Sequence, residues 1–342
     1  MPSVQTNLTR LLDIQTPIVL AAMGGASNGE LAVKVSLGGG YGFIGTAMND
    51  PASFSKELDT ARSLLGVVDP DAPLPLGVGY LGWLLEKGDR TQQLLNIGLE
   101  KRVQSVWLSF GSNLGKWVEY VRQYDSQRTT EHKTLIWIVA SSLEEATRAV
   151  NEWKPDVLVV QGCEAGGHGH SEALPLTSLL GLVKAKFPDG PPVVAAGGIV
   201  NGAQIAGLLL MGADGTVMGT RFAATIESSY SLNQKKSLVE ATSSIRTLVF
   251  DTINGPTLWP EGIDGRALRN KAVIDVEAGN VDFEERKRLY NEAVKNDDTS
   301  RMAVWAGSSV GLVNDIPSAS VLVEQIHQEL VDALGNASSF LG

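Results

Sequence analysis

Residues 156–170 read DVLVVQGCEAGGHGH. The run Val157–Val160 is β-branched and apolar, which is typical of a strand buried on both faces. Polar and glycine-rich sequence follows and cannot continue that strand. Two of the chain's four histidines, and its single cysteine, fall within these 15 residues. A buried strand ending in GGHGH would bring an imidazole to the rim of a parallel sheet, on backbone that can closely approach a flat ligand.

The same strand-then-glycine pattern recurs on both sides of this stretch. Apolar strands alternate with helical segments, and successive strands are spaced roughly 20 to 35 residues apart. The eight predicted strands are Pro17–Met23, Tyr41–Gly45, Leu74–Val78, Ser105–Ser109, Leu135–Val139, Val157–Val160, Pro192–Ala196 and Asp214–Met218. This number and rhythm predict an α/β protein with a (β/α)8, or TIM, barrel.

The alternative α/β fold is an open, doubly wound sheet. Such a sheet would carry a glycine-rich fingerprint after its first strand and a ribose-binding acid after its second. The glycines Gly38–Gly40 instead follow a predicted helix, where they read as a helix stop. The sequence therefore favours the barrel.

After Arg221 the alternation is lost. Turns, mixed charge and a charged helix at Phe283–Val294 follow, before an amphipathic helix at Ser318–Leu334. Segments that follow the eighth strand should lie over the C-terminal rim of the barrel. We therefore predict a barrel formed by residues 1–221 and 304–342, with a mostly helical cap at residues 222–303.

Composition limits the class of protein and its partners. The chain has 342 residues, 43% of them hydrophobic and 19% charged, which are globular values. A net charge of −10 argues against nucleic acid or an anionic membrane as the main partner. One cysteine excludes an internal disulfide, and neither a signal peptide nor an apolar run long enough to span a bilayer is apparent. We expect a cytoplasmic protein, with the oligomeric state, including a homodimer, left open.

The predicted strand ends should meet at the mouth of the barrel, where TIM-barrel active sites lie. They are rich in glycine and poor in charge, which suits a large planar cofactor that brings its own reactivity. The strand ends are Ala22–Gly24, Gly77–Gly79, Ser109–Phe110, Gln161–His170, Gly197–Gly198 and Met218–Thr220. The loops after the seventh and eighth strands are the usual phosphate site of such barrels, with Thr220 and Arg221 as further donors. Alternatively, each glycine pair only turns the chain.

His168 is the candidate catalytic base, since an imidazole titrates near neutral pH and can take a proton from an acidic C–H group. His170 is expected at the rim. The two histidines lack further convergent ligands, so no metal site is predicted. Cys163 is expected to be a small filler rather than a nucleophile. Gln161 is a candidate partner for a cofactor ring edge, and Glu164 is expected to orient the histidine loop or pair with a basic residue.

Several motifs, in order along nearly the whole chain, resemble those of the nitronate monooxygenase (2-nitropropane dioxygenase) family of flavin-dependent barrels. They are Pro17–Gly24, QGCEAGGH at 161–168, AAGGI at 195–199, MGTR at 218–221, WPEG at 259–262 with GRALR at 265–269, and WAG at 305–307. Two features depart from the family: Ser308 stands where Gln is frequent, and the third strand's exit lacks an Asn found in many bacterial members.

The resemblance implies a non-covalent FMN with its phosphate on Gly197, Gly198, Gly219 and Thr220. The residues expected to contact FMN are Ala22, Met23, Gly24, Gly77, Gln161, Gly166, Gly167, Gly197, Gly198, Met218, Gly219 and Thr220. It also implies that an alkyl nitronate gives one electron to FMN, that O2 captures the radical pair, and that a carbonyl compound and nitrite leave. His168 would extend this chemistry to neutral nitroalkanes.

Three other functions are left open by the sequence. Sister groups with the same glycine and histidine motifs are NAD(P)H-dependent FMN reductases that use quinone or enoyl-thioester acceptors. A flavin-free barrel resembling IMP dehydrogenase would use Cys163 as its nucleophile. A non-catalytic binding barrel would have its mouth blocked by the cap.

Overall fold

Eight parallel strands form a barrel in the computed structural model, which describes residues 3–47, 49–279, 281–337 and 339. The spatial order is β1-β9-β8-β6-β5-β4-β3-β2. The barrel closes between β1 and Tyr41, whose N–H donates to the Ile18 carbonyl and whose carbonyl accepts from the Leu20 N–H, both at 2.9 Å. The strands are β1 (Ile18–Leu20), β2 (Phe43–Gly45), β3 (Leu74–Leu81), β4 (Val103–Ser109), β5 (Leu135–Ala140), β6 (Val157–Gln161), β8 (Val193–Ala196) and β9 (Gly215–Met218). The predicted TIM barrel is confirmed.

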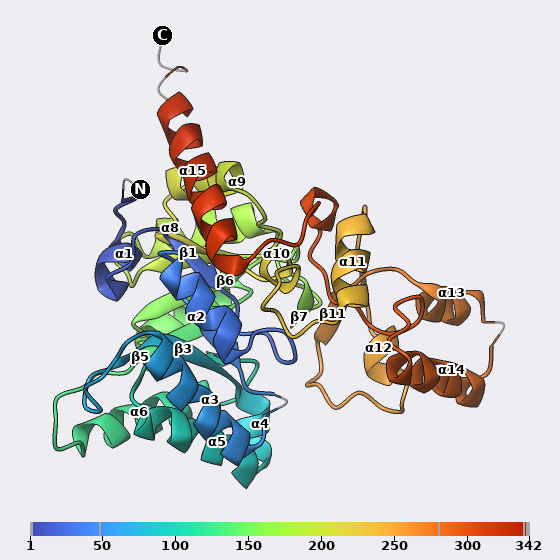
Figure 1. Ribbon diagram of the computed structural model, residues 1–342, viewed down its shortest axis with the longest axis horizontal. Helices are drawn as coiled ribbons and strands as arrows, with labels where there is room; N and C mark the ends of the chain where they lie inside the picture. The colour runs from blue at the N-terminus through green and yellow to red at the C-terminus, as the bar shows by residue number, and fades with distance from the viewer. Residues whose placement is uncertain (1–2, 48, 280, 338, 340–342) are drawn as a thin grey trace.

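Helices flank the strands and cover the outside of the barrel (Figure 1). They are α2 (Gly29–Leu37), α3 (Pro51–Leu64), α4 (Gly82–Lys87), α5 (Asp89–Glu100), α6 (Leu114–Ser126), α7 (Leu143–Arg148) with the π-helical turn η1 (Ala149–Trp153), α8 (Leu176–Lys186), α9 (Gly202–Leu210), α10 (Thr220–Ala223) and α15 (Ala319–Ala337). The predicted last helix, α15, packs against α9 and α2. No helix within the described ranges is both long and apolar enough to cross a membrane.

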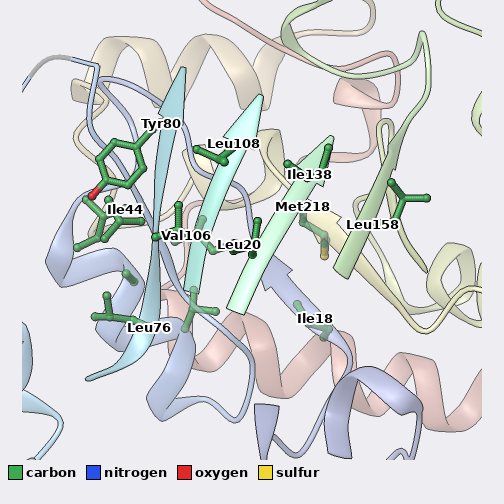
Figure 2. Packing of buried hydrophobic residues seen from close by; sticks show 14 of the residues in the cluster. Ile18, Leu20, Ile44, Leu76, Tyr80, Val106, Leu108, Ile138, Leu158 and Met218 are labelled. Carbon is green, nitrogen blue, oxygen red and sulfur yellow. The ribbon is translucent and has the colours of Figure 1, made fainter. Parts of the chain in front are cut away.

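Alternation along the strands separates two apolar layers. Residues facing the outside pack against the helices, and Figure 2 shows several of them, with Ile18, Leu20 and Met218 among those labelled. Residues facing the inside fill the barrel with rings, such as Tyr41 stacked on Trp137 at 6.0 Å between ring centroids. The barrel interior is therefore a packed core rather than an open channel.

The short helix α1 (Asn7–Leu12) closes the other end of the barrel. Its residues Leu8 and Leu12 belong to the inside cluster. The Thr6 hydroxyl donates to the Asp214 carbonyl at 2.6 Å, which fixes the start of α1 beside β9. The N-terminal segment therefore plugs this end of the barrel.

The cap, residues 222–303, lies to one side of the barrel (Figure 1). Its helices are α11 (Leu232–Glu240), α12 (Val249–Thr252), α13 (Lys271–Ala278) and α14 (Phe283–Lys295). The sequence reading missed a three-stranded antiparallel sheet. Its central strand is β11 (Ile263–Ala267) of the cap, which pairs on one side with β10 (Ile245–Thr247) and on the other with β7 (Gly167–His170). The GGHGH segment does not continue the barrel strand β6, as predicted, but it forms a separate strand in the sheet of the cap. The turn η2 (Val310–Leu312) follows the cap.

Candidate active site

A cavity of about 350 Å³ opens at the C-terminal ends of the barrel strands, and we call it the central cavity. This volume is typical of small-molecule sites, which run from about 300 to 1,000 Å³. Its lining includes eleven residues singled out from the sequence: Ala22, Met23, Gly24, Gln161, Gly166, Gly167, His168, Gly197, Gly198, Gly219 and Thr220. The two predicted phosphate loops and the predicted base therefore share one space.

Two of the predicted contacts, Gly77 and Met218, are not among the residues that line the central cavity. Met218 is fully buried in the outer layer because the alternation of β9 turns its side chain toward the helices. Gly77 pairs with Phe43, and a Cβ there would lie 2.1 Å from the Phe43 ring. Its small size makes room for that ring deep in the barrel. Gly79, two residues further along β3, reaches the cavity instead.

The glycine loops combine unusual backbone with tight packing. Gly197 and Gly198 have φ values of +120° and +68°, which side-chain-bearing residues rarely adopt. A Cβ on Gly198 would lie 3.0 Å from the Glu164 Cβ, and one on Gly166 would lie 2.4 Å from the Gly307 amide nitrogen. The glycines thus turn the chain, as the simpler interpretation had it, and also present bare backbone to the cavity.

Of the two predicted phosphate donors, Thr220 and Arg221, only the first is at the central cavity. Thr220 lines the cavity, and its Oγ1 accepts from the Gly307 N–H at 2.8 Å, which joins α10 to the loop after the cap. Arg221 is buried and turned away, with its guanidinium bonded to the carboxylate and carbonyl of Asp315. Because the guanidinium is paired with Asp315, Arg221 does not point toward the central cavity. Its predicted role as a phosphate donor is therefore wrong.

The Gln161 side chain ends β6 and lines the cavity. Its Oε1 is buried and has no hydrogen-bond partner within the described part of the chain. A buried amide oxygen without a partner is costly, by roughly 1–3 kcal/mol. A ligand that donates a hydrogen bond here would remove that cost, in keeping with the predicted role at a cofactor ring edge.

His168 lies on β7 with its imidazole in the cavity wall. The ring stacks on Trp259, with 3.8 Å between centroids and an angle of 15°, and contacts Trp305 at 4.7 Å. Its Nε2 lies 2.7 Å from Asp251 Oδ1. The ring is thus clamped between aromatic side chains and a carboxylate, with a side-chain exposure of 13%.

Asp251 is the main site residue that the sequence reading missed. It lies on the four-residue helix α12 of the cap, 83 positions from His168, and no motif surrounds it. Its side chain is 6% exposed, and Oδ2 has no partner among the residues that the structure describes. A carboxylate hydrogen-bonded to one imidazole nitrogen fixes the tautomer and leaves the other nitrogen able to accept a proton.

Tyr230 and Ser309 also line the cavity without having been singled out. Burial raises the pKa of the Tyr230 phenol well above its ordinary value, so this group stays a neutral hydroxyl. Trp259 and Trp305, which entered the sequence analysis only as parts of motifs, both form walls. Aromatic residues in an irregular segment give no sequence signal that separates wall from core.

His170 points away from the central cavity, as expected. Its Nε2 lies 2.9 Å from Glu145 Oε1. Burial opposes ionisation of Glu145, but hydrogen bonds from His170 and the Ser141 amide outweigh it and hold the pKa of this carboxyl below its ordinary value. This pair joins the cap sheet to α7 on the barrel.

Cys163 and Glu164 are structural. Cys163 is outside the central cavity, and burial, followed by the nearby Glu164 charge, raises the pKa of its thiol. Glu164 accepts from the Leu176 N–H at 3.0 Å through each of its carboxylate oxygens, so it caps α8. Pro175 offers no side-chain cap for α8, and Glu164 supplies it. The Glu164 charge also acts on the basic residue Arg266.

Comparisons with known proteins agree with this geometry. The nitronate monooxygenase family model matches residues 80–329. Nitronate monooxygenase npaC of Metarhizium robertsii is 35% identical over 92% of this chain and 91% of its own. Nitronate monooxygenase of Neurospora crassa is 32% identical over 99% of this chain and 96% of its own.

Two solved structures share the fold of this chain. FabK from Thermotoga maritima superposes with a TM-score of 0.79 at 25% identity, covering 99% of this chain and 100% of its own. Nitroalkane oxidase from Streptomyces ansochromogenes superposes with a TM-score of 0.77 at 28% identity, covering 97% of this chain and 99% of its own. By the extent of the family match and of these relatives, the chain belongs to the nitronate monooxygenase family of flavin-dependent oxidoreductases.

Proposed function

We propose that the protein binds FMN in the central cavity and uses O2 to oxidise alkyl nitronates to a carbonyl compound and nitrite. The observation that carries this proposal is the convergence of Gly197–Gly198 and Gly219–Thr220 on the cavity that holds the His168 imidazole. Bare amides at those loops suit a phosphate, and a single buried base suits a carbon acid.

The residues at the cavity fit FMN in shape and in hydrogen bonding. A Cβ on Gly79 would lie 2.2 Å from the Ala22 Cβ, so this part of the wall is built of very small groups that admit a flat ring. Gln161 offers an unpaired buried amide oxygen to a ring N–H. FMN, when bound, supplies the electron acceptor for the oxidation.

The protein's own groups handle the proton and the carbon chain. His168 takes the α-proton from a neutral nitroalkane, and Asp251, 2.7 Å away, stabilises the imidazolium that results. A nitronate has already lost this proton and needs the base less. The apolar rings of Trp259 and Trp305 beside His168 keep water from that face of the site.

An anaerobic titration tests this function. Purified protein should show a flavin absorbance spectrum, which propyl-2-nitronate should change without O2. With O2, nitrite and acetone should form. A yellow protein that responds to no nitronate would refute the substrate assignment and leave the cofactor standing. Rapid bleaching by NADPH alone would instead identify the reductase that the sequence left open.

A further inference from the structure

A second cavity of about 440 Å³, the side cavity, lies next to the central one. The two cavities share Phe110, Val139 and Trp259 as lining residues. The Phe110 and Trp259 rings meet edge to face, with 5.7 Å between centroids. These two rings, together with Val139, form the partition between the two cavities.

The backbone at Phe110 is strained. Its φ is +54°, in the left-handed region that bulky residues avoid, at a cost of about 1–3 kcal/mol. The Phe110 carbonyl accepts from the Trp83 N–H at 2.9 Å, which fixes this turn to the start of α4. Strain of this kind persists where the surrounding structure holds it, and here it directs a ring into the partition.

Apolar and charged residues together line the rest of the side cavity. Trp83 contacts Trp259, with 5.4 Å between ring centroids, and the π-helical turn η1 brings in Trp153. The charged or titratable members of the lining are Glu86, Lys87, Glu145, Arg148, His170 and Glu261. Leu258 lines the mouth with 74% of its surface exposed. The apolar members of the lining favour an apolar group of the ligand, because each buried methylene gains about 0.8 kcal/mol on leaving water.

The side cavity also contains an unpaired polar group. Ser141 is 2% exposed, and its Oγ has no hydrogen-bond partner within the residues described. A buried hydroxyl of this kind is rare in protein cores. Its presence in the wall indicates a space that receives a molecule rather than one that side chains fill.

We infer that the side cavity receives the apolar tail of the substrate, whose nitro-bearing carbon lies at His168 in the central cavity. The substrate class is therefore a nitronate or nitroalkane with an elongated alkyl or aryl tail, rather than a compound of two or three carbons. This inference rests on the proposed function, since it places the reacting carbon in the central cavity. Phe110 and Trp259 then act as specificity-determining residues, because the tail must pass between them.

A series of ethyl-, butyl-, hexyl- and octylnitronate tests the inference on the holoenzyme. kcat/KM should rise by about fourfold per added methylene once the tail passes the partition. Leu258→Glu, which places a carboxylate at the mouth, should remove the rise for the longer tails and leave ethylnitronate unchanged. Leu232→Glu, on an exposed leucine of the cap that lines neither cavity, should keep the full rise.

Binding without turnover separates this inference from the proposed function. Alkanoates share the planar anionic group of nitronates but cannot be oxidised, and their affinity, measured by flavin absorbance or tryptophan fluorescence, should rise along the same series. If the affinity for alkanoates rose with tail length but no nitronate was oxidised, the tail site would be supported and the proposed function rejected. Oxidation of ethylnitronate with no effect of tail length in either series would overturn the tail site, as would an unchanged rise in Leu258→Glu.

Discussion

Asp251 Oδ1 lies 2.7 Å from His168 Nε2, and the two residues come from opposite sides of the boundary between barrel and cap. His168 follows the sixth barrel strand, β6, whereas Asp251 lies on α12 of the cap. The pair therefore exists only when the cap is in place. Its function in proton transfer can be separated from flavin chemistry by comparing substrates that need a base with substrates that do not.

Asp251→Asn should slow the oxidation of nitroethane by about tenfold to a hundredfold, because the amide no longer stabilises a protonated His168. Ethylnitronate should be oxidised within about threefold of the normal rate, since it needs no deprotonation. The rate of nitrite release with each substrate gives the ratio of the nitroethane rate to the ethylnitronate rate. Asp275→Asn, which breaks the ion pair with Arg301 elsewhere in the cap, is the control and should leave the ratio unchanged. Equal losses for both substrates in Asp251→Asn would show a merely structural role.

Gly198→Ala should lower the FMN content of the purified protein. A side chain at φ +68° costs about 1–2 kcal/mol, and its methyl group would lie 3.0 Å from the Glu164 Cβ. The ratio of flavin to protein absorbance measures the effect. Gly207→Ala on α9 meets no atom within 4 Å and should keep its FMN. Full FMN content in Gly198→Ala would remove this loop from the phosphate site.

Cys163→Ala should retain activity, because the thiol lies outside the central cavity. Burial raises the pKa of this thiol, so little thiolate is present at neutral pH. Alkylation by iodoacetamide should be slow there and accelerate above about pH 9, past the ordinary thiol pKa of about 8.5. Mass spectrometry of the labelled peptide follows the rate. Rapid labelling at neutral pH with loss of activity would revive the nucleophile hypothesis.

Asp156 should stabilise the fold at neutral pH and lose that effect in acid. Burial opposes its charge, but hydrogen bonds from Lys133, the Ile136 amide and Arg122 prevail and lower the pKa of this carboxyl. A folded-state pKa below the unfolded value of about 3.9 means that the stabilisation is present above that pH and is lost as pH falls through the folded value.

Asp156→Asn should therefore lower the free energy of unfolding by about 1–3 kcal/mol at neutral pH. The difference from the unsubstituted protein should narrow below about pH 4. Urea unfolding at both pH values gives the comparison. Glu152→Gln, in an exposed pair with Arg148, should change stability by less than about 1 kcal/mol at either pH. A difference for Asp156→Asn that stayed constant with pH would contradict the account.

The barrel was predictable because its information is local. Runs such as Val157–Val160 are apolar and β-branched, and their exits contain glycine, so strand ends and loops could be placed from the sequence. The same local pattern does not show how deep within the barrel a residue of the strand lies. Gly77 and Gly79 look alike in sequence, yet Gly77 packs on Phe43 and Gly79 lines the cavity, because the difference is set by register with neighbouring strands.

The cap was harder for a related reason. Strand β7 consists of two histidines and two glycines, so it shows no apolar periodicity, and its partner β11 lies about a hundred residues later. Asp251 likewise acquires its role only through tertiary contact. A short strand that pairs across such a distance can be recognised only once both partners are placed.

The shared sheet has a mechanical consequence. His168 sits on β7 and is paired across the sheet with Gly265 of β11, so the imidazole is fastened to the cap as firmly as to the loop that precedes it. A movement of the cap that widened the entrance would also displace the His168 imidazole from the cavity. The protein could then not bind substrate through that entrance and deprotonate it in the same conformation, so the open form would be inactive until the cap closed.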